Sequence, residues 1–144
     1  MHKMTSHHAR LRVMALALIL ASCATGLTGD RESAMEGVDD ANKSLLAMAE
    51  SGAFDQAAVN EEARVIATKL EVFQGLFPAG SESAGGAAKA TIWTDPAGFE
   101  AAGKDAHDAA VELAAVTDAA TFAIALDTLQ GTCKACHTKY RASK

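Results

Sequence analysis

The sequence predicts an all-α fold, an antiparallel four-helix bundle with one long crossover loop between its second and third helices. Hydrophobic residues make up 49% of the chain and aromatic residues only 5%, and alanine is abundant, a composition that suits closely packed helices better than sheets. Four segments repeat apolar residues at steps of three and four, the spacing of a helix with one buried face. Two short connections and one long connection join these segments, as in a four-helix bundle.

The predicted second helix, residues 55–74, has the most regular pattern. Its inward positions, separated by steps of four and three, are Val59, Ala63, Ile66, Leu70 and Phe73. Asp55 can accept hydrogen bonds from the free N–H groups of the first turn, while Phe54 packs beside this cap. Gly75 follows the last turn, where glycine often ends a helix.

The predicted third helix follows the same spacing, whereas the predicted first helix is less regular. The first spans residues 31–50 and has Gly37 as a weak point, because glycine is a poor helix former. The third starts at the cap Asp95, with Pro96 in the first turn, where its missing N–H costs nothing. Residues 75–94, between the second and third helices, are rich in glycine, serine and alanine and form the long crossover.

The predicted fourth helix starts from Thr117 or Asp118 as its cap and carries two cysteines on its inner stripe. This stripe consists of Phe122, Leu126, Leu129, Cys133, Cys136 and Tyr140. The sequence contains no convincing strand pattern, internal repeat or phosphate-binding glycine loop. One helical domain therefore follows the N-terminal segment.

The N-terminal segment has the layout of an export signal. Residues 1–22 carry three basic residues and no acidic one, and an apolar run at 13–21 follows the charges. This run is too short to remain as a membrane-spanning helix. It ends in Leu-Ala-Ser-Cys, which is similar to a bacterial lipobox and predicts that Cys23 is lipidated and anchors the protein to a membrane. Ordinary cleavage nearby, with Cys23 removed or left as a thiol, is the alternative, and both predict a periplasmic protein.

The prediction thus divides the chain into a lipoprotein-type export signal at 1–22, a short linker at 23–30 and the bundle at 31–144. Loss of the signal removes three of the 13 basic residues and none of the 18 acidic ones, which leaves a net charge of about −8. This charge argues against nucleic acid as a partner. Four of the ten remaining basic residues gather in the last eleven positions, and this positive patch predicts docking of an acidic redox partner. The patch consists of Lys134, Lys139, Arg141 and Lys144.

Cys133, Cys136 and His137 belong to the pentapeptide Cys-Lys-Ala-Cys-His. Two thiols three residues apart on a helix lie on one face, so each can add to one of the two vinyl groups of a haem. A histidine one residue later can then bind the iron from one side. The pentapeptide therefore predicts one covalently bound haem c.

Other uses of the cysteine pair fit the sequence less well. A structural zinc site needs four ligands, and the further candidate His107 falls between the inward positions of its helix, which favours a solvated role. A thiol oxidoreductase places its pair at a helix N-terminus, whereas this pair lies near a helix C-terminus. A disulfide within a continuous helix strains the bridge. A haem-free helical bundle remains the third alternative.

Several motifs in residues 31–144 agree with one known family. They are Arg31 and Met35 in the first helix, Phe-Asp-Gln-Ala-Ala-Val at 54–59, Leu-Phe-Pro at 76–78, Ile-Trp-Thr-Asp at 92–95, the pentapeptide at 133–137, and Tyr140 with Arg141. With these motifs the sequence resembles the class II cytochromes c, the group that includes cytochrome c′ and its six-coordinate, low-spin relatives. The resemblance implies a bundle with the haem lying across it near one end and the first helix covering the distal side. It also implies a homodimer through the first two helices as one arrangement, since family members often pair in this way.

The resemblance implies a role for each residue that matches the family pattern. Cys133 and Cys136 would be the thioether anchors, and His137 the proximal iron ligand. Arg31 would lie near a haem propionate, and Arg141 near the exposed proximal side.

The role of Met35 stays open, since the family places at this position either an iron ligand or a bulky residue that blocks the site. Ligation by its thioether favours reduced iron and predicts one-electron transfer with redox partner proteins, which is the leading hypothesis. Without ligation, Met35 is core filler or a steric gate, and five-coordinate iron binds nitric oxide or carbon monoxide, which is the alternative. No catalytic constellation is found, so the chain is predicted not to be an enzyme.

Overall fold

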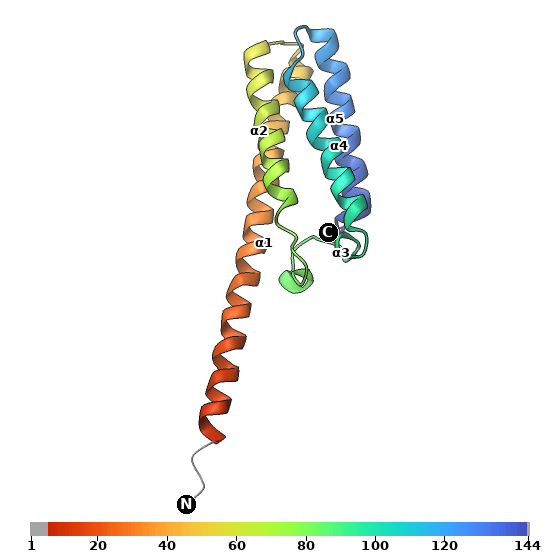
Figure 1. The fold of residues 1–144 in the computed structure, drawn as a ribbon. Coiled ribbons are helices and arrows are strands. Elements are labelled where there is room, and N and C mark those ends of the chain that lie inside the picture. Colours follow the sequence, from red (N-terminus) through yellow and green to blue (C-terminus); the bar gives the residue numbers. More distant parts are fainter. Residues whose placement is uncertain (1–5, 144) are drawn as a thin grey trace, which may run out of the picture.

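The computed structural model describes the backbone of residues 6–143 and the side chains of residues 26–143. The helices, in chain order, are α1 (Ser6–Ser51), α2 (Gln56–Gln74), the short 3₁₀ helix η1 (Glu82–Ala84), α3 (Thr91–Thr94), α4 (Pro96–Ala114) and α5 (Ala119–Tyr140). The long helices α1, α2, α4 and α5 lie side by side in an antiparallel bundle (Figure 1). The predicted four-helix fold is therefore confirmed.

The first helix is longer than the sequence pattern predicts. It begins at Ser6 and projects beyond the bundle at its N-terminal end (Figure 1), so the predicted start near residue 31 is wrong. No proline interrupts residues 6–31, which are mostly helix-forming residues, and the glycines at 26 and 29 are tolerated. The side chain of Cys23 lies outside the described residues. Among the residues described, no helix is long and apolar enough to cross a membrane.

Three aspartates begin the other long helices, as predicted. Asp55 and Asp118 each accept hydrogen bonds from two N–H groups of the turn that follows. Asp95 accepts one from the N–H group of Gly98, and Pro96 occupies the first helical position after it. Each bond satisfies a donor that the helix itself leaves unpaired.

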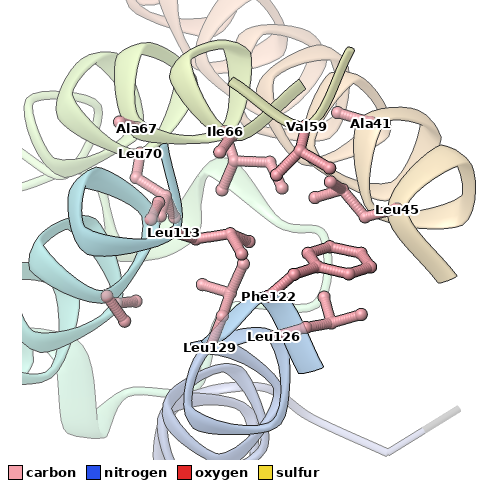
Figure 2. Packing of buried hydrophobic residues seen from close by; sticks show 14 residues of the cluster. Ala41, Leu45, Val59, Ile66, Ala67, Leu70, Leu113, Phe122, Leu126 and Leu129 are labelled. Carbon is pink, nitrogen blue, oxygen red and sulfur yellow. The ribbon is translucent and has the colours of Figure 1, made fainter. Parts of the chain in front are cut away.

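The main hydrophobic cluster fills the bundle between its four long helices. Figure 2 shows Leu45 of α1 and Ile66 of α2 pointing toward Leu113 of α4 and Phe122 of α5. Most of the other members are alanines, including Ala41, Ala63, Ala106, Ala109 and Ala110. These small side chains let the helices approach closely, so the predicted inward stripes do form the core.

Gly37, which looks like a defect in the first helix, lies at a close contact between α1 and α2. A Cβ atom at this position would lie 3.0 Å from Cε of Lys69. The lysine stem thus occupies the space that a side chain would need. The glycine lowers helix propensity but permits this packing.

The crossover between α2 and α4 is more ordered than a plain loop. It contains η1 and one turn of helix, α3, inside the stretch predicted to be irregular. A second hydrophobic cluster forms where it meets the ends of α2, α4 and α5, with Ile92, Phe99 and Tyr140 buried at its centre. The crossover also reaches α1, because the hydroxyl of Thr28 donates to the carbonyl of Ala84. This end of the bundle therefore contains both the crossover and the cysteine segment.

Candidate functional site

The cysteine segment forms the last turns of α5. Cys133 and Cys136 are free thiols, and both are half-buried. Cys133 packs against the main cluster, and Cys136 packs against the second cluster. The two sulfur atoms therefore face the interior at the boundary between the clusters, as the sequence pattern predicts.

Burial sets the protonation state of both thiols. Desolvation raises the pKa of Cys133 and of Cys136, and the neighbouring Cys133 raises the pKa of Cys136 further. Both groups are therefore neutral thiols near pH 7, unlike the low-pKa thiolates of redox-active pairs.

His137 lies on the more open side of α5. Its side chain is largely exposed, yet the atoms around it desolvate the ring and, with the nearby positive charge of Arg141, lower its pKa. The imidazole is therefore neutral at physiological pH, with a nitrogen lone pair available to a metal. The N–H group of Arg141 donates to the carbonyl of His137 at 3.0 Å, and the arginine side chain is exposed.

Arg31 is a buried cation at the same end of the bundle, with 6% of its surface exposed. Its Nε donates to the carbonyl of Leu76 at 3.0 Å, and its Nη2 donates to Oγ of Ser81 at 2.9 Å. The guanidinium carbon lies 4.3 Å from the ring centre of Phe77 and 5.5 Å from that of Trp93. Burial lowers the pKa of this group.

The third nitrogen of Arg31, Nη1, is buried without a hydrogen-bond partner. No carboxylate among the described side chains forms an ion pair with this guanidinium either. A buried donor without an acceptor costs about 1–3 kcal/mol, and more when it carries charge. An anionic oxygen at this position would remove that cost.

The second cluster connects Arg31 to Cys136. Its partly buried members include Phe77 and Trp93, which flank the Arg31 guanidinium, and Cys136. The site thus offers two inward thiols, a neutral imidazole and a cation that lacks an anion. This set fits a haem c, whose vinyl groups, iron and propionates would meet these groups in turn.

Met35 lies on α1, one turn after Arg31. It is partly buried and packs against the main cluster, as Cys133 does from α5. The inner face of α1 beyond Arg31 is apolar, with Ala34 and Ala41 buried and Val38 partly buried. The inward neighbours of Met35 are therefore apolar, and the polar Asn42, whose Oδ1 accepts from Nε2 of Gln130 of α5, lies two turns further along.

Comparison with known proteins matches residues 27–141 to the family model described as cytochrome C′. The chain belongs to the cytochrome c′ family. The resemblance to the class II cytochromes c is thereby confirmed, and so is the cofactor, because members of the cytochrome c′ family carry covalently bound haem c.

Individual members of the family show the extent of the similarity. Cytochrome c′ of Rhodospirillum rubrum is 41% identical over 86 residues, which span 57% of this chain and 58% of that protein. Cytochrome c-556 of Agrobacterium tumefaciens is 37% identical over 117 residues, which span 79% of this chain and 95% of that protein. A nitric oxide complex of a cytochrome c prime variant from Alcaligenes xylosoxidans is 26% identical, with a TM-score of 0.77 over 84% of this chain and 97% of that one.

The sequence pattern does not reveal the polar contacts that hold this end of the cytochrome c′ fold together. Ser81, the partner of Arg31, lies in the crossover with no distinguishing motif. Asp95 is predicted only as a cap, yet it also binds Lys139 and Tyr140 of α5. These bonds lower the pKa of Asp95, with Lys139 the largest cause, then Tyr140 and the backbone of Gly98. The only sequence signals for them are the two family motifs that contain Asp95 and Tyr140, and neither relates the two positions to each other.

Proposed function

We propose that this cytochrome c′ family member is a periplasmic haem protein that binds nitric oxide or carbon monoxide at five-coordinate iron. In this proposal Cys133 and Cys136 hold the haem through thioether bonds, and His137 is its proximal ligand. Arg31 pairs with a propionate, which the buried and unpartnered Nη1 supports.

The residues on the distal side of the haem determine which gas the iron binds. Met35 blocks direct approach as a steric gate, and its inward neighbours Ala34 and Val38 give a bound gas no hydrogen-bond donor. Such a wall suits neutral nitric oxide and carbon monoxide better than dioxygen, whose bound form is stabilised by a donor. The observation that carries this choice is that Met35 packs into the main cluster as an apolar side chain. The nitric oxide complex of the similar Alcaligenes xylosoxidans variant supports the same choice.

The visible spectrum of the haem-loaded, reduced protein tests this function. We expect stoichiometric binding of carbon monoxide, and faster binding in Met35→Ala because the gate is removed. Met48→Ala is a matched control, since Met48 is also a partly buried methionine of α1 but lies more than three turns further along. Failure of the reduced protein to bind carbon monoxide would exclude a gas-binding role.

Electron transfer with Met35 as sixth ligand is the second candidate. Met35 supports it, because a thioether at the distal position can bind iron and favours the reduced state. This arrangement predicts sharp, split bands in the ferrous spectrum that Met35→Ala removes. An unchanged spectrum in that variant would exclude Met35 as the sixth ligand and leave gas binding as the remaining candidate function.

We further propose that residues 1–22 direct export and that Cys23 becomes the lipidated N-terminus of a membrane-anchored protein. The mature chain then begins at Cys23 and meets its redox partners in the periplasm. The exposed side chains of Lys134 and Arg141 offer an acidic partner a positive surface beside His137. Mass spectrometry of the mature protein tests the anchor, since a Cys23→Ser variant should lose the acyl mass and leave the membrane fraction.

A further inference from the structure

The carboxylate of Asp95 joins the start of α4 to the end of α5. Its Oδ1 atom accepts a hydrogen bond from the N–H group of Gly98 at 3.2 Å. Its Oδ2 atom accepts from Nζ of Lys139 at 2.6 Å and from the hydroxyl of Tyr140 at 3.0 Å. One side chain therefore caps one helix and anchors another.

Close packing surrounds this carboxylate. A Cβ atom at position 98 would lie 2.3 Å from Oδ2 of Asp95 and 2.6 Å from the hydroxyl of Tyr140, so only glycine fits there. The ring of Tyr140 is buried, with 3% of the residue exposed, and meets the ring of Phe99 edge-on at 5.3 Å. Tyr140 is thus fixed both by its ring and by its hydroxyl group.

The crossover holds the same end of α5 through its backbone. The backbone N–H group of Lys89 donates to the carbonyl of Tyr140 at 3.0 Å. The side-chain Nζ of Lys89 donates to the carbonyl of Thr138 at 2.9 Å. The hydroxyl of Thr91 donates to the carbonyl of Lys139 at 3.1 Å. These bonds satisfy carbonyl groups that the end of a helix leaves without partners.

His137 lies within the turn that these contacts hold. Tyr140 follows it by three residues, less than one turn of helix, so the exposed imidazole and the buried phenol belong to the same last turn of α5. A shift or rotation of the last turn of α5 therefore moves the imidazole as well. The bond from the N–H group of Arg141 to the carbonyl of His137 closes this turn.

We infer that Asp95 is a positioning residue for His137, acting through Tyr140 and Lys139 on the turn that carries the imidazole. The inference rests on the proposed role of His137 as proximal ligand. By this inference Asp95, which lies at the start of α4 and 42 positions before His137, helps to set the orientation of the imidazole toward the iron.

The other two capping aspartates provide the comparison that isolates this role. Among the described residues, Asp55 and Asp118 accept only from groups of their own first turns. Asparagine caps helices about as well as aspartate but carries no charge. Asp95→Asn thus keeps the cap and weakens the contacts to α5, whereas Asp55→Asn changes a cap that makes no such contacts.

The experiment measures the iron–histidine stretching band by resonance Raman spectroscopy of the ferrous haem protein, immediately after photolysis of its carbon monoxide complex. We expect the band to shift in Asp95→Asn and in Tyr140→Phe and to stay unchanged in Asp55→Asn. Amide hydrogen exchange supplies a second readout that does not depend on ligand binding. The N–H group of Ala142, which donates to the carbonyl of Ala87 at 2.8 Å, should exchange faster in the first two variants only.

An unshifted band in Asp95→Asn with covalent haem retained would overturn the inference and leave Asp95 as a helix cap. If Asp95→Asn does not mature, Tyr140→Phe is the deciding variant, because it removes only the hydroxyl group. An unshifted iron–histidine band in Tyr140→Phe would likewise overturn the inference. A lack of haem in the unsubstituted protein would instead contradict the proposed function.

Discussion

Replacing Arg31 with methionine tests whether this cation pairs with an anion of the haem. Methionine has a similar length but carries no charge and no donor. The substitution removes the bonds to Leu76 and Ser81 and also removes the buried Nη1 donor that lacks a partner. Its effect on stability therefore depends on what Nη1 meets in the haem-loaded protein.

The two outcomes differ enough in free energy to be distinguished. Each charge-assisted bond contributes about 1.5–3 kcal/mol, while removal of the unpaired donor returns about 1–3 kcal/mol. The two bonds to Leu76 and Ser81 together contribute about 3–6 kcal/mol, so without an anion the net loss is about 2–3 kcal/mol and at most about 5 kcal/mol. If a propionate pairs with Nη1, the substitution also leaves that carboxylate without its partner, which adds about 3–5 kcal/mol. Because no unpaired donor is removed in that case, we expect a loss of about 6 kcal/mol or more in the haem-loaded protein.

The assay is guanidinium chloride unfolding of the haem-loaded protein near neutral pH, followed by helical circular dichroism. Arg64→Met is the matched control, since Arg64 is exposed on α2 and should change stability by no more than about 0.5 kcal/mol. A loss below about 5 kcal/mol in Arg31→Met would refute the pairing, because the two hydrogen bonds, less the gain from removing an unpaired donor, account for a loss up to that size.

Further predictions concern acid stability and the core. The pKa of Asp118 is lowered from 3.8, first by the backbone N–H of Thr121, so its contribution to stability is present above the unfolded value and is lost as pH falls through the lower folded value. Asp118→Asn keeps the cap without titrating and should flatten the fall of melting temperature below about pH 4; an unchanged slope would contradict this. Leu113 is fully buried, and Leu113→Ala should cost about 2–5 kcal/mol in denaturant unfolding. Ile124, 70% exposed, should tolerate alanine within about 0.5 kcal/mol, and similar losses for the two variants would be inconsistent with the packing.

The features that sequence analysis predicts correctly depend on neighbours in the chain. Asp55 caps α2 because its side chain reaches N–H groups two and three residues ahead. The inward stripes follow from the period of the helix, which places Cys133 and Cys136 on one face without any knowledge of the partner helices.

The features that sequence analysis does not predict depend on distant segments. Arg31 binds Leu76 and Ser81, which lie 45 and 50 residues away, and no periodicity relates these positions. Asp95 satisfies the local rule for a cap, so its bonds to α5 leave no further trace in the pattern. The start of α1 is missed for a different reason. The helix begins at Ser6, whereas the amphipathic pattern begins only near residue 31.

Mass spectrometry of the peptide that contains residues 133–137 is the most direct test of the haem site. The protein should be exported in a host that matures c-type cytochromes, and the peptide should carry the added mass of one haem on Cys133 and Cys136. Replacing both cysteines with serine should abolish the added mass. Recovery of the peptide from the unsubstituted protein with both thiols unmodified would contradict the assignment of this segment as the haem attachment site.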